Sequence, residues 1–150
     1  MAKNYFTAAL LVLGTCASAT APAQDMASRV QTQVLGADNQ PELVQFNAAG
    51  KRAYRGVDAR QVLRQQLALT TADEMVPRSA ETDALGFTHQ KFNQLYQGIR
   101  VEHASYTVHA KDGTVESISG DFEKVANLNT TPSLGPSAAL RRALAFVGAQ

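Results

Sequence analysis

The sequence contains very few cysteine and aromatic residues and no tryptophan. Its 150 residues include one cysteine, Cys16, and no tryptophan, and aromatic residues make up 7% of the total. So few large aromatic side chains indicate a modest hydrophobic core. If the N-terminal segment that carries Cys16 is removed, no cysteine remains, which excludes a disulfide, a catalytic thiol and a cysteine-ligated metal.

Charge of one sign and long apolar runs are also scarce. The formal net charge is +1 and the sequence has no run of Lys or Arg. The composition therefore gives no reason to expect nucleic acid or another polyanion as a partner. Beyond the N-terminus no apolar run reaches the length that spans a bilayer, so we expect no stable membrane span. The length allows one ordinary domain and part of a second.

Three common catalytic signatures are absent from the sequence. It contains no H-E-x-x-H, no G-x-S-x-G and no glycine-rich phosphate-binding loop. H-E-x-x-H supplies two zinc ligands and a general base, so these residues cannot activate water by that route. We assign no catalytic, cofactor-binding or metal-ligating residue within the chain. Whether the natural protein is an enzyme depends on the residues encoded beyond Gln150.

Residues 1–23 have the pattern of a secretory signal peptide. Lys3 supplies the positive start, residues 6–13 form an apolar segment too short to span a membrane, and residues 21–23 offer small side chains for cleavage. Residues 17–19 are a second possible cleavage site. The pattern predicts a secreted, extracellular protein.

Cys16 raises the question of a lipid anchor. The residue before it is Thr15, whereas a lipoprotein signal requires Gly, Ala or Ser there. We therefore expect ordinary cleavage and no lipidation of Cys16.

The part of the chain before residue 84 predicts much irregular structure. Residues 24–55 are rich in Gln, Asn and Ala with weak periodicity, which predicts an irregular lead-in. A capping pattern across residues 71–74 predicts a short helical turn. Residues 78–83 are expected to form a polar loop.

One longer helix is predicted between these segments. Residues 57–69 place their apolar side chains on one helical stripe, with Gly56 or Asp58 as N-cap. Arg60 and Arg64 fall on the solvated face of this helix.

Residues 85–122 predict three consecutive antiparallel strands. Gln97-Gly98 and Asp112-Gly113 are two-residue turn signals that separate runs rich in β-branched and aromatic residues. The expected strands cover residues 89–96, 99–109 and 114–122. A simple register places Tyr96 opposite Ile99, Gln94 opposite Val101 and Phe92 opposite His103.

The alternation of apolar residues changes within the second of these strands. In the simple register one face carries Phe92, Tyr96, Ile99 and Val101, and the other carries Lys91, Asn93, Arg100 and Glu102. Tyr106 and Val108 then fall on the second face. Either both faces are covered there, or a bulge near His103-Ala104 reverses the alternation, and we favour the bulge.

The three histidines, His89, His103 and His109, raise the question of a metal site. His103 and His109 are six residues apart on one strand, too far to bind one ion together, and His89 would lie opposite Tyr106. We expect ordinary strand histidines with hydrogen-bonded neighbours. Glu116 would be the cross-strand partner of His109, a pair worth about 0.2–1 kcal/mol.

The C-terminal residues return to helical spacing after a linker. Residues 126–136 have the Thr, Pro and Gly content of a linker, and residues 137–147 are amphipathic with Ser137 as the expected N-cap. A lone amphipathic helix has no sheet on which to bury its apolar face, which indicates a truncated second domain.

Many spaced positions in the strand region resemble the FTP (fungalysin/thermolysin propeptide) domain. The matching positions are Leu85-Gly86, His89, Phe92, Gln94, Tyr96, Gly98, Val101, Val108-His109, Asp112-Gly113 and Gly120. The sequence departs from the usual pattern at Glu102-His103, where many members have an aromatic residue and a glycine. In this family an FTP domain precedes a PepSY domain, whose first helix is similar to residues 137–150.

The resemblance implies an α+β fold with a three-strand antiparallel sheet and a packed N-terminal helix at residues 56–125. It implies the N-terminal propeptide of a secreted thermolysin-like zinc metalloendopeptidase, which assists folding of the catalytic domain in cis and inhibits it. Zinc, with or without calcium, would belong to that catalytic domain. The alternatives are an exported inhibitor or chaperone acting in trans, and an envelope binding module with no peptidase partner. Eight residues are expected to hold the module together in structural roles: Phe92, Gln94, Tyr96, Gly98, Val101, Val108, His109 and Gly120.

Overall fold

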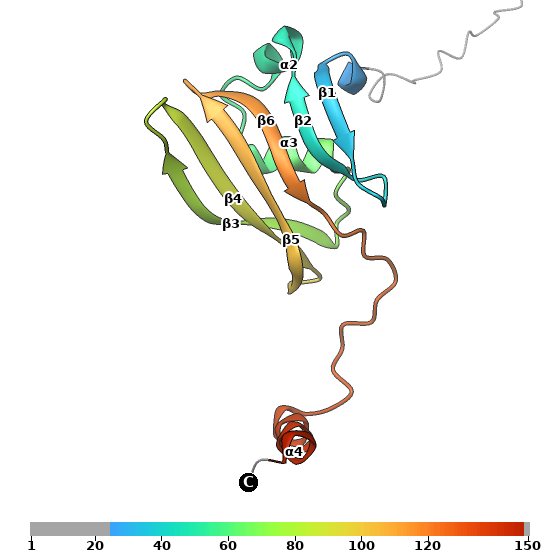
Figure 1. Cartoon of the computed structure of the whole chain (residues 1–150). Coiled ribbons are helices and arrows are strands. Elements are labelled where there is room, and N and C mark those ends of the chain that lie inside the picture. The colour runs from blue at the N-terminus through green and yellow to red at the C-terminus, as the bar shows by residue number, and fades with distance from the viewer. Residues whose placement is uncertain (1–24, 149–150) are drawn as a thin grey trace, which may run out of the picture.

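The structure, a computed structural model, describes residues 25–148. It is an α+β fold built on a six-stranded antiparallel sheet with the strand order β1-β2-β6-β5-β4-β3 (Figure 1). The strands are β1 (Val30–Leu35), β2 (Pro41–Phe46), β3 (Asp73–Thr82), β4 (Phe87–Tyr96), β5 (Ile99–Lys111) and β6 (Thr114–Asp121). The helices are α2 (Ala48–Ala53), α3 (Ala59–Gln66) and α4 (Pro136–Val147).

The three predicted strands are confirmed as β4, β5 and β6, and so are both turns between them. Gln97 and Gly98 have φ values of 49° and 79°, and Asp112 and Gly113 have values of 50° and 71°. Positive φ at both central positions is the geometry that matches the right-handed twist of a hairpin. Tyr96 lies opposite Ile99, as predicted.

The predicted bulge in β5 is also confirmed. Between the pairs Asn93–Ser105 and Leu95–Arg100, β5 advances by five residues while β4 advances by two. The difference of three is odd, so it reverses the alternation of the faces. His103, within the bulge, has a φ of 64°.

The bulge makes two details of the simple register wrong. Phe92 lies opposite Tyr106 rather than His103, and the expected pairing of Gln94 with Val101 falls within the bulge. Ile99, which the simple register places on the same face as Phe92 and Tyr96, is 52% exposed.

The predicted irregular lead-in is wrong, because residues 30–53 supply β1, β2 and α2. Val44 and Phe46 of β2 are 0% and 1% exposed, and Val44 lies opposite Ile118 of the central strand β6. Val44 and Phe46, together with the buried Pro41, anchor this strand, while Glu42 and Gln45 point to solvent. The sheet is therefore twice as wide as the three strands that the sequence predicts.

The segment before the first predicted hairpin is a strand as well. The helical turn expected at residues 71–74 and the loop expected at residues 78–83 are wrong, because both lie in or beside β3. β3 is the edge strand next to β4, and its pairing shifts between Pro77 and Ser79. An edge position tolerates proline, since one side of the strand needs no ladder hydrogen bond.

One face of the sheet is covered by helices. The predicted helix is α3, and Asp58 is its N-cap, because Asp58 Oδ1 accepts a hydrogen bond from the Arg60 amide at 2.9 Å. Val62 and Leu63 of α3 are completely buried in the core. Figure 1 shows α3 behind the sheet, while within residues 25–148 no helix covers the front face. We call these the covered face and the open face.

The C-terminal helix α4 contains no buried residue. Its N-cap is Gly135, with Pro136 in the first turn, so the predicted N-cap at Ser137 is wrong. Leu140 and Phe146 are 60% and 92% exposed. No helix in the described part of the chain has the length and apolar character needed to cross a membrane.

Candidate functional site

Two histidines of neighbouring strands meet on the open face. His89 of β4 is paired with His109 of β5, and their Nδ1 atoms are 2.7 Å apart. The prediction that His89 lies opposite Tyr106 is wrong, because the bulge in β5 shifts the register by three residues. Both imidazoles are partly buried.

A carboxylate and a hydroxyl extend this pair at its two ends. His89 Nε2 lies 3.1 Å from Asp83 Oδ2 in the β3–β4 turn, and His109 Nε2 lies 2.9 Å from Ser119 Oγ of β6. The four side chains of Asp83, His89, His109 and Ser119, which we call the polar chain, therefore join the turn to three strands. All four imidazole nitrogens have a partner.

Two ionisable groups of the polar chain have shifted pKa values. The Phe87 amide, followed by the His89 side chain, lowers the pKa of Asp83, whose Oδ1 also accepts a hydrogen bond from the Leu85 amide at 2.9 Å. Burial, followed by the charge of His89, lowers the pKa of His109. The protein thus favours an ionised Asp83 and a neutral His109.

The contact between Ser119 and His109 has the atoms of a nucleophile and its base, but its surroundings do not build a catalytic site. Ser119 lies in the middle of the sheet, opposite Leu43 on one side and Thr107 on the other. Backbone amides at such a position are used by the sheet ladder and do not converge as an oxyanion hole. The polar chain is suited to holding protons, not to acyl transfer.

Glu116 does not join the histidines. The prediction that it lies opposite His109 is wrong, because a register shift in β6 places Ser117 there. Glu116 forms an ion pair with Lys51 of α2 instead. Among residues 25–148 no group of three or more His, Cys, Asp or Glu side chains is arranged to hold a metal ion.

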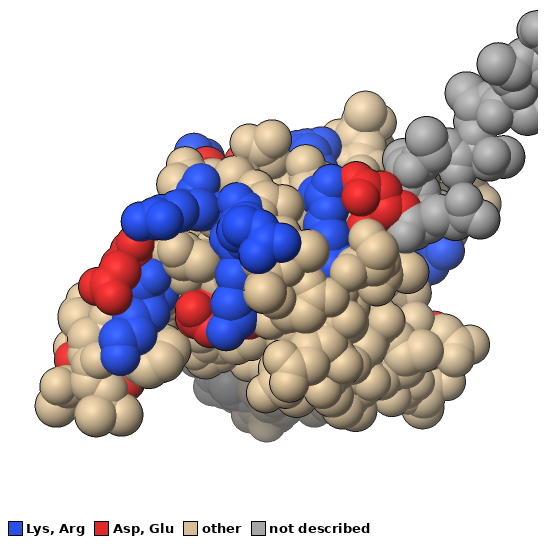
Figure 2. All heavy atoms as spheres, turned by 90° about the horizontal axis from the view of Figure 1, so that it is seen from above, with Lys and Arg blue, Asp and Glu red and all other residues tan. Residues whose placement is uncertain are grey.

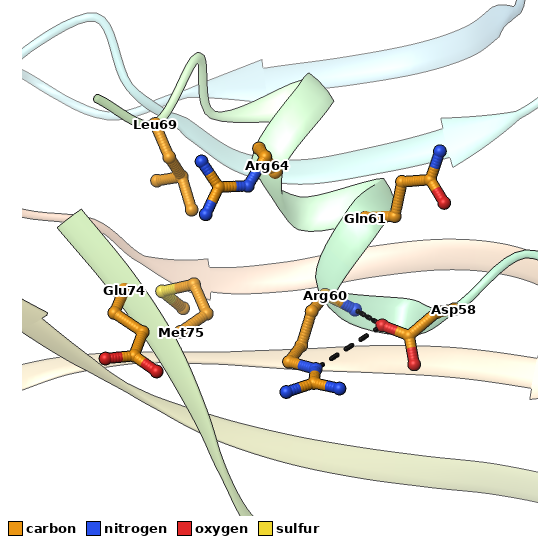
Figure 3. A pocket seen from close by; sticks show the side chains of 7 residues that line it. All are labelled: Asp58, Arg60, Gln61, Arg64, Leu69, Glu74 and Met75. Carbon is orange, nitrogen blue, oxygen red and sulfur yellow. Dashed lines mark hydrogen bonds and ion pairs between the residues drawn. The ribbon is translucent and has the colours of Figure 1, made fainter. Parts of the chain in front are cut away.

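A hollow of about 350 Å³ lies between α3 and β3 (Figure 3). Arg60 and Arg64 extend from α3, and Glu74 lies across the hollow on β3. Asp58 contacts Arg60 at 3.5 Å. Two arginines are thus balanced by two carboxylates, so the hollow has no net charge to select an anion. The prediction that Arg60 and Arg64 lie on a solvated face is confirmed.

Basic side chains gather at the end of the molecule that carries α2 and the β5–β6 turn (Figure 2). Arg55 follows α2 and forms an isolated antiparallel β-bridge with Thr114 through its backbone. The Gly56 amide donates a hydrogen bond to the Gly113 carbonyl at 2.7 Å. These bonds bring Lys51 and Arg52 of α2 close to the turn. Because Lys51 is already neutralised by Glu116, the cluster is partly compensated.

Gln94 fixes the point at which the chain leaves the sheet. Its side chain is 0% exposed, donates to the Glu123 carbonyl at 2.7 Å and accepts from the Glu123 amide at 3.0 Å. Asp73, 5% exposed, lies 3.5 Å from the same amide nitrogen of Gln94 and accepts a hydrogen bond from the Thr70 hydroxyl at 2.6 Å. A buried amide with this many partners supports the structural role predicted for Gln94.

A protein-family model matches the strand region of the chain. The model of the Fungalysin/Thermolysin Propeptide Motif matches residues 73–122, which cover β3, β4, β5, β6 and Phe122. The match begins before the resemblance seen in the sequence and includes the edge strand β3. It ends at residue 122, so the PepSY assignment of residues 137–150 stays a prediction. Residues 73–122 carry an FTP motif, which suggests the propeptide region of a fungalysin/thermolysin-family peptidase.

Proposed function

We propose that this chain is the N-terminal propeptide region of a secreted thermolysin-like zinc metalloendopeptidase precursor. The observation that carries the proposal is the family match over four sequential strands, residues 73–122. The motif implies association with a thermolysin-like catalytic domain. The zinc, and any calcium ion, belong to that domain in this proposal.

The propeptide acts as a tethered ligand of the catalytic domain. A tether raises the effective concentration of the bound module, and a ligand that binds only the folded state stabilises that state. Such a module assists folding and blocks the active cleft until the tether is cut. Release is then a matter of dilution, because the two parts become separate molecules.

The proposal divides the chain into segments. Residues 1–23, which lie outside the described residues, are the signal peptide; residues 56–125 are the FTP-like domain; residues 126–136 are the linker. Residues 137–150 are the first helix of a PepSY-like domain. The exposed apolar side chains of α4, Leu140, Leu144 and Phe146, support this last assignment because they need a further element to cover them.

A refolding assay tests the proposal. A thermolysin-family catalytic domain is denatured and refolded with and without the purified chain, and its proteolytic activity and complex formation are measured. We expect a higher yield of folded enzyme, and inhibition of that enzyme while the chain stays bound. The matched control is the Gly120→Ala variant, in which the added Cβ meets the backbone of β5 and disrupts the sheet.

Two of the alternatives give different outcomes in the same assay, whereas a chaperone that acts in trans raises the refolding yield as a propeptide does and is separated from it by the reading frame beyond Gln150. An inhibitor that acts in trans without chaperone activity gives inhibition with no gain in refolding yield. An envelope binding module gives neither inhibition nor a complex on size exclusion. Either result contradicts the proposed propeptide function.

A further inference from the structure

The polar chain admits only one arrangement of protons when both histidines are neutral. The ionised Asp83 can only accept, so His89 carries its proton on Nε2 and its Nδ1 is an acceptor. His109 must then donate from Nδ1, which leaves its Nε2 to accept from the Ser119 hydroxyl. His109 is thereby held with its proton on Nδ1.

One added proton reverses the direction of two hydrogen bonds, His89–His109 and His109–Ser119, and breaks none of the three. A protonated His89 donates from both nitrogens, to Asp83 on one side and to His109 Nδ1 on the other. His109 then carries its proton on Nε2 and donates to the Ser119 oxygen. All three hydrogen bonds survive, and the charge of His89 faces a carboxylate.

A second proton cannot be accommodated. With both imidazoles charged, each Nδ1 carries a hydrogen, and two donors face one another across 2.7 Å. The two positive charges also repel at short range in a partly buried site. The His89–His109 contact must therefore open before both rings can be charged.

Other charges around the pair do not supply a second counter-charge. The charged residues on these strands are Asp73, Glu74, Arg78 and Glu81 of β3, Lys91 of β4, Arg100, Glu102 and Lys111 of β5, and Glu116 and Asp121 of β6. Those nearest to the pair in the register are Glu81, Lys91, Lys111 and Glu116. Glu81 lies opposite His89 but contacts Lys91 at 3.7 Å, and Glu116 is paired with Lys51. Lys111 lies 4.9 Å from the Phe87 ring centroid, and Asp121 lies opposite Ser105, away from the pair.

We propose that the polar chain is a proton-operated latch that ties the β3–β4 turn to β5 and β6 and opens when the histidine pair binds its second proton. The latch is a regulatory device in the FTP-like sheet. It does not depend on the proposed propeptide function, since its test needs no peptidase.

The direction of the pH effect on stability follows from the lowered pKa values of His109 and Asp83. The pKa of His109 is lowered, so the folded state binds fewer protons than the unfolded state near the ordinary histidine value of 6.5. The stability from the latch is complete above that value and is lost as pH falls through the lower pKa of the folded state. Asp83 has its pKa lowered from 3.8, so its contribution is lost only at still lower pH.

Nitrogen NMR of the wild-type chain tests the proton arrangement directly. At pH 8 we expect His89 with its proton on Nε2 and His109 with its proton on Nδ1. On acidification His109 changes to the Nε2–H form before it becomes fully protonated. Two Nε2–H histidines that titrate independently near pH 6.5 overturn the latch.

Thermal unfolding as a function of pH tests the consequence. Between pH 7.5 and 5.0 we expect the midpoint of the wild type to fall by roughly 5 °C, and that of the double variant His89→Gln/His109→Gln to fall much less. The matched control is His103→Asn, which removes the exposed third histidine at a positive φ that asparagine tolerates, and keeps the full fall. An equal fall in the double variant contradicts the proposal.

Discussion

The two faces of the sheet differ in the kind of interaction that each contributes to the molecule. The covered face packs Val44, Phe46 and Ile118 with residues of α3 in one apolar core. The open face carries hydroxyl, amide and imidazole side chains, and the hydrogen bonds of the polar chain connect Asp83 to Ser119 across it. Apolar burial is insensitive to pH, whereas a chain of hydrogen bonds through imidazoles is not. We therefore expect the covered face to supply most of the folding stability, and the open face to supply its dependence on pH.

The largest expected loss comes from crowding the sheet at Gly120. A Cβ on this residue would lie 2.2 Å from the Ser105 carbonyl oxygen and 2.6 Å from the Tyr106 Cα, so backbone must move. We expect Gly120→Ala to lower the free energy of unfolding by about 4 kcal/mol or to prevent folding. Denaturant unfolding measures this loss.

The matched control for that prediction is Gly135→Ala. Gly135 has a φ of −67°, and an added Cβ there meets nothing within 4 Å. It precedes α4, which contributes no buried residue, so the unfolding of the sheet should be unchanged. A similar loss in both variants would contradict the packing described for Gly120.

The next largest effect is expected at Gln94 on the covered face. Gln94→Leu removes both hydrogen bonds to Glu123 and the amide next to Asp73, which leaves backbone groups and a buried carboxylate with fewer partners. We expect a loss of about 2 kcal/mol in thermal or chemical unfolding. Gln33→Leu on the exposed strand β1 makes the same change without buried partners and should be near neutral.

A smaller effect is expected at the turn between β4 and β5. Gly98 has a φ of 79°, which a β-branched residue adopts only with strain. Gly98→Val should cost about 1–2 kcal/mol of stability, and Gly98→Asn should cost less, because asparagine tolerates positive φ. Equal stability of Gly98→Val and the wild type contradicts the turn assignment.

Zinc should have the smallest effect. The Nδ1 atoms of His89 and His109 already bind one another, and no third His, Cys, Asp or Glu is grouped with them as a metal site among the described residues. Zinc at concentrations well above that of the protein should leave the thermal midpoint unchanged. A saturable rise would show that the open face binds metal.

The sequence predicted the centre of the sheet and missed its edges for a physical reason. Gln97-Gly98 and Asp112-Gly113 signal their turns locally, and the apolar alternation around His103 revealed the bulge. β1 and β3 carry few buried side chains, so they lack the alternation by which a strand is recognised, and their pairing depends on distant residues.

The polar chain could not be predicted from the sequence in detail. The sequence reveals a bulge through the change in the alternation of apolar residues, but it does not reveal how many extra residues the bulge contains. Because β5 has three extra residues there, His109 and not Tyr106 lies next to His89. Gln94 was predicted to be structural, but its bonds to Glu123 join residues far apart in the sequence. Such pairings arise from the folded register alone.

The reading frame beyond Gln150, checked by the intact mass of the unprocessed product, tests the proposed propeptide function most directly. The 150 residues account for 16.1 kDa. We predict that the frame continues into a region with H-E-x-x-H and a downstream glutamate ligand, and that the product is heavier by the mass of one or two domains. A frame that closes at or near Gln150, with a product of the mass of this chain, would contradict a propeptide acting in cis.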